Sequence, residues 1–463
     1  MRRALALVPL LTALCPTLMW AEASPEVRAC WVSRFGWPSA NRDEAFGNIT
    51  RIMERLAEHN FNTVLFQIRG QCDVHYPSPY EPWSDDYDWQ DPGFDPVAFA
   101  VEEAHRNGLE FHAYINTHTL AQSIPPEHTE PEHQYNLHGR AGVEENWTIH
   151  GEDGQPTQTE DAYVWMSPGI PEASAWTRQA VLHVVETYDV DGVHFDRIRT
   201  PAPEYSHDPI TQVRFEGIGN PDRLGWGDFM RSQITRDLRK IYGAIRRIDP
   251  DCVISSAPFG INSRQPGGYQ GTGTESRNEW YQDSFVWMES HVHDMLFPQI
   301  YWGIGSAHPF EVLLADFMRH TGGRHMCAGI NSRNDVLAQI AEARRQGAAG
   351  TTIWGRVPYE DLLADLYAEP APIPERPWLT HPTTGIVVGT VTDEGGEPVC
   401  DAYVRIDEDP YTYLSGWDGF YAILDVVPGE HTVRFSIDPE RREFTEVATD
   451  VAAGNVVDLD FTP

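Results

Sequence analysis

The stretch DGVHFD, Asp191 to Asp196, decides the fold, because it has the composition of a buried strand that ends on a charged residue. An amphipathic helix pattern, Glu172 to Tyr188, precedes it, and another, Asp228 to Ile248, follows it. Short apolar strands that alternate with helices of this length are typical of parallel α/β folds. The pattern therefore predicts an α/β protein with a parallel sheet.

The same alternation continues on both sides of this stretch. Further helix patterns cover Asp43 to His59, Val97 to Asn107 and Asp335 to Gln346. Eight strands with intervening helices predict a TIM-type (β/α)8 barrel, with a doubly wound open sheet as the main alternative. No G-x-G-x-x-G or Walker loop follows a strand, which counts against a nucleotide-binding open sheet. The predicted strands are Val27 to Ser33, Thr63 to Arg69, Glu110 to Asn116, Gly192 to Asp196, Val253 to Ala257, Met295 to Trp302, His325 to Ile330 and Gly350 to Trp354.

Four of the segments that follow strands are long and rich in proline, glycine, aromatic and acidic residues. In a barrel these segments all emerge at the carboxyl ends of the strands, where active sites are assembled. The pattern predicts a large cleft on that face. The four segments are Gly70 to Asp95, Thr117 to Met166, Arg197 to Gly227 and Gly260 to Asp283.

The chain divides into four parts. Residues 1–23 have the basic, apolar and A-x-A regions of a cleaved secretory signal, which predicts a secreted or periplasmic protein. The barrel is expected over residues 24–368. A proline-rich linker is expected over 369–383. Residues 384–463 carry short β-rich runs separated by Gly, Pro and Asp turns, which predict a small all-β sandwich.

Charge and cysteine content exclude several classes of partner. The chain has 69 acidic and 34 basic residues, a net charge of −35, so its surface repels nucleic acid and anionic membranes. After the signal, no stretch approaches the ~20 apolar residues of a membrane span.

The five cysteines outside the signal lack the spacing of a zinc or redox motif, and His105, His112 and His118 lack ligand spacing. We therefore expect no metal and no cofactor.

Polar side chains gather at the carboxyl ends of four strands. Residues two apart in a strand share a face. Polar groups inside a barrel are costly unless they are hydrogen-bonded, so a shared site is favoured, and a buried network in which they satisfy one another is the alternative. The sets are Gln67 and Arg69; His112, Tyr114 and Asn116; His194 and Asp196; and Gln299 and Tyr301.

Asp196 is the sharpest catalytic candidate. It closes the fourth strand, and Arg197 and Arg199 beside it are expected to favour its ionised form. An ionised carboxylate in a cleft suits a nucleophile, or a group that stabilises an oxocarbenium ion, in glycoside cleavage. The alternative is an internal salt bridge with those arginines.

Glycoside hydrolysis normally needs a second carboxyl group as general acid. Glu81 and Asp73, in the loop after the second strand, are the first candidates, and Glu279 and Asp283 come behind them. Asp294 is a poorer candidate because it lies at the start of its strand, on the face of a barrel that serves stability.

The expected substrate-binding residues combine aromatic rings, which stack on the apolar faces of sugars, with donors and acceptors for their hydroxyl groups. Further aromatic residues, among them Trp31, lie at strand ends or in the loops. The expected substrate-binding residues are Arg69, His112, Asn116, His194, Arg197, Gln299, Tyr301, Trp302 and Trp354.

Residues 27 to about 368 resemble the glycosyl-hydrolase-like family ten barrels of bacterial exported proteins. The resemblance implies a TIM barrel that acts on polysaccharide, with bacterial cell-wall glycan as one substrate class, and it places Asp196 in the site. It is carried by RACWV at 28–32, FNTVLFQIR at 61–69, YPS at 76–78, EPWS at 81–84, DPGFDP at 91–96, PGIPE at 168–172, DGVHFD at 191–196 and PQIYW at 298–302.

The chain departs from that family at two positions. The family usually has an acidic residue where Arg197 stands, and asparagine where Ser167 stands; both lie near the expected site and bear on substrate preference and activity. The tail resembles a carboxypeptidase-regulatory-like, transthyretin-type sandwich through GTVTD at 389–393 and DGFY at 418–421. The sequence predicts a secreted glycoside hydrolase, with an inactive glycan-binding surface protein as the alternative, and leaves the oligomeric state open.

Overall fold

The computed structural model describes residues 24–156, 163–355, 366–438 and 443–463. The predicted signal, residues 1–23, lies outside the described residues, as does the part of the predicted barrel at 356–365. Within the described part, none of the helices combines the length and the apolar character that a membrane crossing requires.

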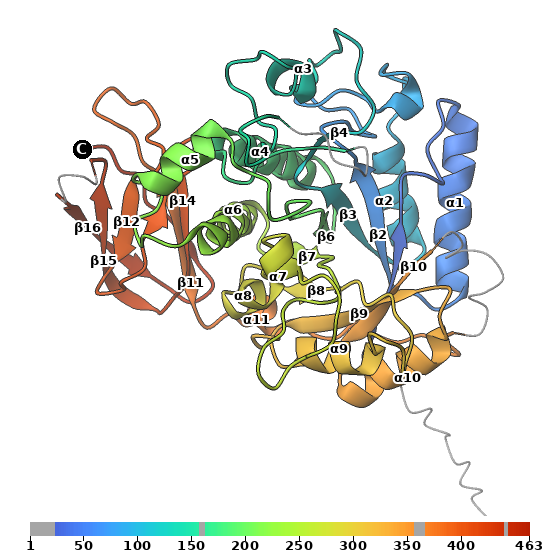
Figure 1. The fold of residues 1–463 in the computed structure, drawn as a ribbon. Coiled ribbons are helices and arrows are strands. Elements are labelled where there is room, and N and C mark those ends of the chain that lie inside the picture. The colour runs from blue at the N-terminus through green and yellow to red at the C-terminus, as the bar shows by residue number, and fades with distance from the viewer. Residues whose placement is uncertain (1–23, 157–162, 356–365, 439–442) are drawn as a thin grey trace, which may run out of the picture.

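Eight parallel strands close into a barrel, which confirms the predicted fold class (Figure 1). Neighbours around the barrel follow the order β1-β10-β9-β8-β7-β6-β3-β2. The strands are β1 (Val27–Val32), β2 (Thr63–Arg69), β3 (Glu110–Asn116), β6 (Gly192–Asp196), β7 (Val253–Ser256), β8 (Met295–Leu296), β9 (His325–Asn331) and β10 (Gly350–Trp354).

Helices surround this barrel, and the five predicted ones are present to within two residues at each end. Side-chain caps explain several starts: Asn41 accepts from the Glu44 amide, and Asp95 accepts from those of Val97 and Ala98. The longer helices are α1 (Arg42–Glu58), α2 (Pro96–Arg106), α4 (Pro171–Thr187), α6 (Trp226–Ile248), α9 (Phe310–Met318) and α10 (Val336–Gln346). The shorter ones are α5 (Pro209–Glu216), α7 (Ser276–Glu279) and α8 (Ser284–Glu289).

The sixth barrel strand is much shorter than predicted. It was expected to run from Met295 to Trp302, but β8 ends at Leu296, and Gln299 then makes only isolated bridges to Phe259 and Gly329. Pro298 explains the break, because proline has no N–H to donate to a neighbouring strand. Helix α9, which follows this region, was missed in the sequence.

The long segment after β3 forms a small structure of its own. It contains the antiparallel pair β4 (Thr119–Ala121) and β5 (Val164–Trp165), together with the short helix α3 (Gln134–His138). The segment after β2 contains a 3-10 turn, η1 (Asp85–Tyr87). Both segments begin at the carboxyl ends of their strands, on the face of the barrel where Asp196 lies.

The C-terminal residues form two antiparallel-rich sheets, as an all-β sandwich requires. One sheet has the order β14-β11-β17 and the other β13-β12-β15-β16. Strand β16 was not predicted; it pairs with β15 at the edge, where most of its side chains are exposed. The strands are β11 (Gly385–Thr390), β12 (Tyr403–Ile406), β13 (Tyr413–Leu414), β14 (Phe420–Val426), β15 (Gly429–Ser436), β16 (Thr445–Val451) and β17 (Val456–Asp458).

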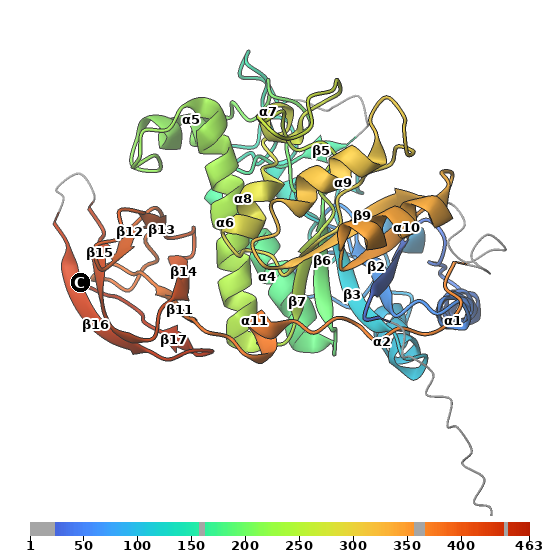
Figure 2. The same cartoon turned by 90° about the horizontal axis from the view of Figure 1, so that it is seen from below.

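The sandwich packs against α6 of the barrel (Figure 2). Gly243 allows this close approach, because a Cβ there would lie 2.6 Å from the methyl group of Ala422. The contact is bordered by ion pairs: Arg214 binds Asp401 through two hydrogen bonds of 2.7 and 2.8 Å. The two parts are therefore joined by a packed interface as well as by the chain.

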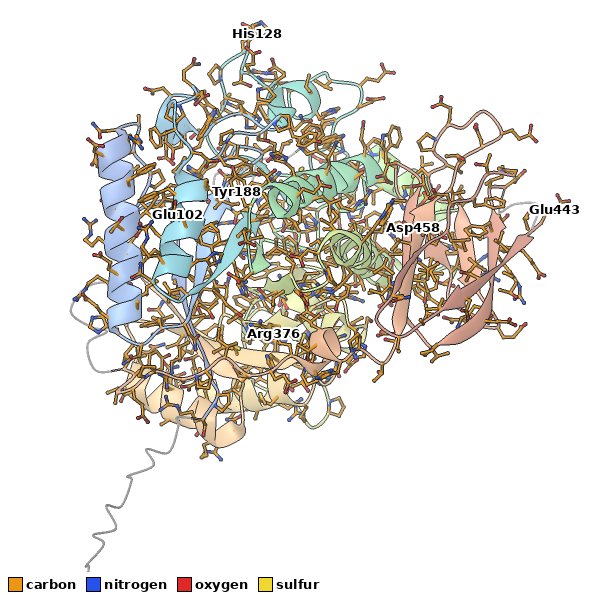
Figure 3. The ribbon with its side chains drawn as sticks, turned by 180° about the vertical axis from the view of Figure 1, so that it is seen from behind. Glu102, His128, Tyr188, Arg376, Glu443 and Asp458 are labelled. Atoms are coloured by element: carbon orange, nitrogen blue, oxygen red, sulfur yellow. The ribbon has the colours of Figure 1, made fainter. Side chains whose placement is uncertain are left out.

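The segment between them lies on the barrel's N-terminal face and includes α11 (Pro377–Thr380). Arg376, labelled in Figure 3, makes two hydrogen bonds to Glu110 at the start of β3, of 2.7 and 2.9 Å. The Glu26 amide, just before β1, donates to the Pro372 carbonyl over 2.9 Å. The proline-rich segment is thus fastened to the barrel along its course.

Candidate active site

Asp196 lies at the carboxyl end of β6, half-buried, with three donors facing its carboxylate. The Tyr114 hydroxyl donates to Oδ2 over 2.8 Å, and the Arg197 backbone N–H donates to Oδ1 over 2.7 Å. The Gln299 amide nitrogen lies 3.5 Å from Oδ1. Arg197 has a φ of 54°, an unfavourable value for a residue with a side chain, and this turn brings its N–H back to the carboxylate.

Tyr114 is suited to this donor role. Its side chain is buried in the barrel, and burial together with the Asp196 charge raises the pKa of Tyr114 well above its ordinary value. Burial and Asp196 raise the pKa of Tyr301 in the same way. Both hydroxyls therefore keep their protons at neutral pH and can donate to a carboxylate or to a substrate oxygen.

A pocket of about 180 Å³ opens in front of Asp196. Its walls are largely aromatic, with the Trp31 ring edge-on to those of Tyr301 and Trp354 at centroid distances of 6.2 and 6.4 Å. Asp196 is the only carboxylate among the described residues that line it. The lining consists of Trp31, Tyr114, Asp196, Arg197, Arg199, Gln299, Tyr301 and Trp354.

The two arginines of the pocket stack on aromatic rings. The Arg197 guanidinium lies 3.9 Å from the centroid of Tyr163, and that of Arg199 lies 4.8 Å from the centroid of Trp280. Such stacking holds a guanidinium in a fixed plane. Arg197 and Arg199, which were expected beside Asp196, therefore form part of the pocket wall and bring positive charge to it.

His194 lies beneath the pocket and fixes the Trp31 ring. The Trp31 indole N–H donates to His194 Nε2 over 2.9 Å, so the histidine proton is on Nδ1, which lies 2.9 Å from the Ser255 hydroxyl. Burial, with His112 and His293 nearby, lowers the pKa of His194 well below its ordinary value. His194 thus acts as a neutral support for the pocket wall and does not line the pocket itself.

The structure places Glu81 away from this pocket. Its carboxylate is buried and binds the Arg69 guanidinium through two hydrogen bonds of 2.6 and 2.7 Å, and it also accepts from the Trp176 indole over 3.1 Å. The register of β2 shifts between Gln67 and Arg69, and the two side chains have different partners: Gln67 accepts from the Arg34 amide. Arg69 and Glu81 therefore form one buried ion pair.

Asp73 is buried at the carboxyl end of β2. Its Oδ1 accepts from the Gln71 amide over 2.8 Å. Burial raises the pKa of Asp73 to about 6, although the Arg34 guanidinium opposes the shift. A carboxyl group of this pKa holds a proton often enough to serve as a general acid. It is not among the residues that line the pocket.

Three further expected binding residues lie outside the pocket lining. His112 is buried deeper in the barrel, beside Gly192, and the Asn116 carbonyl accepts from Arg69. Trp302 packs on Phe259, with ring centroids 5.7 Å apart. Of the expected set, the pocket brings together Asp196, Arg197, Gln299, Tyr301 and Trp354.

The remaining acidic candidates have structural partners. Asp283 accepts from Arg277 over 2.8 Å, and Glu279 accepts from the Glu275 amide over 2.7 Å. Asp294 is fully buried just before β8, at the opposite end of the barrel from Asp196.

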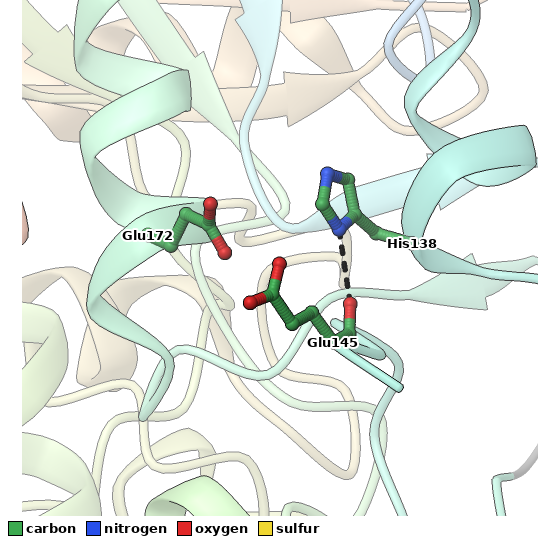
Figure 4. A group of neighbouring side chains, drawn as sticks. All are labelled: His138, Glu145 and Glu172. Atoms are coloured by element: carbon green, nitrogen blue, oxygen red, sulfur yellow. Dashed lines mark hydrogen bonds between the residues drawn. The ribbon is translucent and has the colours of Figure 1, made fainter. Parts of the chain in front are cut away.

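One group of described residues has the composition of a cation site: His138, Glu145 and Glu172, whose ligand atoms lie within 4.8 Å of one another (Figure 4). His138 stacks on the Trp147 ring at 3.8 Å, and Glu172 accepts from the Trp147 indole over 3.0 Å. His138 and Glu172 thus each have a contact with Trp147, and we assign no ion to the group.

Comparison with known proteins agrees with this architecture. The Glycosyl hydrolase-like 10 family matches residues 26–317, which is more than half of the chain. The chain belongs to this family. Glycosyl hydrolase YngK of Bacillus subtilis is 26% identical over 457 residues, covering 88% of this chain and 84% of its own. Glycosyl hydrolase DigH of Escherichia coli K12 is 27% identical over 333 residues, covering 67% and 74%.

A solved structure shares the fold of this glycosyl hydrolase-like chain. The glycoside hydrolase domain of PgaB (BpsB) from Bordetella bronchiseptica superposes with a TM-score of 0.56 and 14% identity, covering 74% of this chain and all of that one. At this identity the likeness concerns the fold alone.

Three residues of the pocket lining in this glycosyl hydrolase-like 10 barrel were noted in the sequence but were not among the expected catalytic or substrate-binding residues: Trp31, Tyr114 and Arg199. Tyr114 alternates with His112 and Asn116 on one face of β3, and Trp31 has the same inward position near the end of β1. The alternation rule places both side chains inside the barrel, and it had already grouped Tyr114 with His112 and Asn116.

Proposed function

We propose that this protein is an exported glycoside hydrolase that cleaves a polysaccharide, with Asp196 as its catalytic carboxylate and with cell-wall glycan as one substrate class. One observation carries the proposal: Asp196 faces an aromatic-walled pocket at the carboxyl end of a glycosyl hydrolase-like barrel, with three donors orienting it. Active sites of TIM barrels lie at this end.

The chemistry follows from these contacts. The Tyr114 hydroxyl donates to one oxygen of the Asp196 carboxylate and the Arg197 backbone N–H donates to the other, so the carboxylate has a defined orientation. A carboxylate held this way can attack an anomeric carbon or stabilise the oxocarbenium-like transition state. Trp31, Tyr301 and Trp354 offer apolar faces to a sugar ring, and Gln299 offers an amide to its hydroxyl groups.

The general acid comes from outside the described pocket lining, and we propose Asp73 ahead of Glu81. Asp73 has a raised pKa of about 6, whereas Glu81 is bound at both oxygens by Arg69. A general-acid variant loses least activity on an aryl glycoside whose leaving group needs no proton. Asp73→Asn is expected to keep activity on such a substrate and to lose it on the polysaccharide; equal losses on both would remove Asp73 from this role.

Glycan binding without cleavage is a second candidate function. It is favoured by Arg197, which stands where the family usually has an acidic residue, and by Asp196 being the only carboxylate among the described lining residues. In this alternative the pocket holds a sugar, and no bond is broken.

Release of reducing ends separates the two functions. Wild type, Asp196→Asn and the exposed control Asp251→Asn are incubated with a panel of polysaccharides and with peptidoglycan glycan. We expect release by wild type and by the control, and none by Asp196→Asn. Binding by all three proteins without release would support the second function and reject hydrolysis.

For the rest of the chain we propose the division expected from the sequence. The barrel would span residues 24–368 and the linker 369–383, and residues 384–463 would form a carboxypeptidase-regulatory-like sandwich without catalytic groups. Release of residues 1–23 during export would be checked by N-terminal sequencing of protein recovered outside the cytoplasm.

A further inference from the structure

A groove at the edge of the barrel, separate from the Asp196 pocket, is lined by both the barrel and the sandwich. It has a volume of about 610 Å³ and shares none of its described lining residues with the pocket. We call it the rim groove. Its lining includes Tyr80, Glu172, Trp176, Gln179, Trp417 and Asp418.

We propose that the rim groove is a second glycan-binding site, which takes a neutral, hydroxyl-rich polysaccharide. The inference rests on the proposed polysaccharide substrate and is independent of catalysis. A site of this kind keeps the protein on a long chain while one sugar unit occupies the pocket.

Two aromatic rings of the groove, those of Trp176 and Tyr80, have contacts that orient them, and a third, that of Trp417, is exposed. The Trp176 indole donates to the buried Glu81 carboxylate over 3.1 Å, and Tyr80 lies edge-on to its ring at 6.0 Å. Trp417 comes from the sandwich and is 52% exposed, which is high for so large an apolar side chain. Rings of this kind provide the flat apolar faces on which sugars stack.

The buried Arg69–Glu81 ion pair helps to hold one ring of the groove in place. A buried ion pair is weak support for stability, because the cost of desolvating both charges offsets their attraction. Here Glu81 has a third partner, Trp176, whose ring lines the groove. Glu81 is therefore a positioning residue for the rim groove.

The polar groups of the groove select an uncharged ligand. Glu172 and Asp418 present carboxylates and Gln179 an amide, which together accept hydrogen bonds from hydroxyl groups. The Arg178 guanidinium in the groove already pairs with Asp418. Acidic polymers are repelled both here and by the net charge of −35.

One segment of the chain contributes to both sites. The Trp147 ring lines the groove, and the Ile149 amide, two residues on, donates to the Trp165 carbonyl over 2.9 Å. The Trp165 ring lies 5.5 Å from the guanidinium of Arg197 in the pocket wall. The two sites are thus built on one folded segment after β3.

Affinity electrophoresis tests the proposal. Native gels contain galactomannan, mixed-linkage β-glucan or glycol chitin, with polygalacturonate as the anionic counterpart. All proteins carry Asp196→Asn, so that no probe is degraded. The variants are Trp417→Ala and Gln179→Ala, both at exposed positions, with Val427→Ala as an exposed control elsewhere on the sandwich.

We expect at least one neutral polysaccharide to retard the parent and the Val427→Ala protein equally, with affinity about ten-fold lower in Trp417→Ala. A smaller loss is expected in Gln179→Ala. Retardation that Trp417→Ala leaves unchanged, retardation by polygalacturonate alone, or no retardation by any neutral probe would each overturn the proposal.

Hydrolysis of a short oligosaccharide distinguishes this inference from the proposed function. With Asp196 restored, Trp417→Ala should cleave a short substrate at the wild-type rate and a long polysaccharide more slowly. If the polysaccharide retards the protein in the gel but the protein cleaves neither substrate, hydrolysis is rejected and the groove proposal is retained. If Trp417→Ala cleaves both the short and the long substrate at the wild-type rate, the groove proposal is rejected.

Discussion

Two aspartates stand at opposite ends of the barrel, and their surroundings differ in kind. Asp196, after β6, faces neutral donors and an open pocket. Asp294, before β8, is fully buried and binds Arg246, Arg324 and the Trp378 indole. Burial opposes its ionisation, but the Arg246 and Arg324 charges outweigh this and lower the pKa of Asp294.

The difference shows how one residue type serves two purposes in one fold. At the N-terminal end every lone pair of the carboxylate is occupied, which stabilises the barrel and leaves no room for a substrate. At the carboxyl end three neutral donors orient the carboxylate, and a pocket that Arg197 and Arg199 also line gives access to it. Reactivity and stability are thus separated along the barrel axis.

The largest expected effect is on catalysis. Asp196→Asn removes the charge that the transition state needs, and kcat/KM on the polysaccharide should fall about 10⁴-fold. The melting temperature should stay near that of wild type, because the amide oxygen can accept from the Arg197 N–H while the amide NH2 donates to the Tyr114 hydroxyl, which can also accept. If Asp196→Asn lost much stability and kept its activity, Asp196 would serve stability, and the assignment of catalysis to the carboxyl end of the barrel would be wrong.

The counterpart is Asp294→Asn, which should act on stability alone. It leaves the buried Arg246 guanidinium without its counter-charge, and the free energy of unfolding should fall by about 3–5 kcal/mol. Urea denaturation measures this loss, with the exposed Asp251→Asn as control. Activity per folded molecule should be unchanged.

Asp73 is expected to respond to pH. Its folded-state pKa is raised from 3.8 to about 6, so its contribution to stability is largest at low pH and is lost as pH rises through that interval. The loss amounts to at most about 3 kcal/mol. Relative to wild type, Asp73→Asn should therefore gain stability between pH values of about 4 and 7, and a pH-independent difference would refute the raised pKa.

The smallest expected effect concerns the pocket wall. Trp31→Phe removes the donor to His194 and leaves Nε2 of that buried ring without its partner, at a cost of about 1–2 kcal/mol in stability. The phenylalanine ring would still line the pocket but would no longer be fixed by His194. We therefore expect weaker substrate binding with little change in the chemical step, so that KM rises more than kcat falls. Steady-state kinetics on the polysaccharide checks this ratio; a fall in kcat alone would place Trp31 in the chemistry itself.

Most of the barrel could be predicted because its strands are apolar runs of the right length. The exception is instructive: Met295 to Trp302 has a strand-like composition, yet Pro298 ends the pairing after Leu296. Asp196 could also be placed, because a residue that closes a strand must lie at the carboxyl end of the barrel.

The partners of the loop acids could not be predicted. Glu81 and Asp73 lie eight residues apart in one loop, but Glu81 is bound by Arg69, whereas Asp73 is buried near Arg34. That outcome depends on how the loop folds over β2, and on a register shift between Gln67 and Arg69 that no periodicity reveals. The rim groove could not be predicted for the same reason, since Trp176 and Trp417 line one groove only in the folded chain.

The fastened linker has a mechanical consequence. A pull on the sandwich would load two connections to the barrel: the α6 interface with its Arg214–Asp401 ion pair, and the linker contacts of Arg376 with Glu110 and of Trp378 with Asp294. The linker contacts would carry their share of the tension into the N-terminal end of the barrel, where Arg246 and Arg324 bind Asp294. Neither connection includes a residue of the pocket around Asp196.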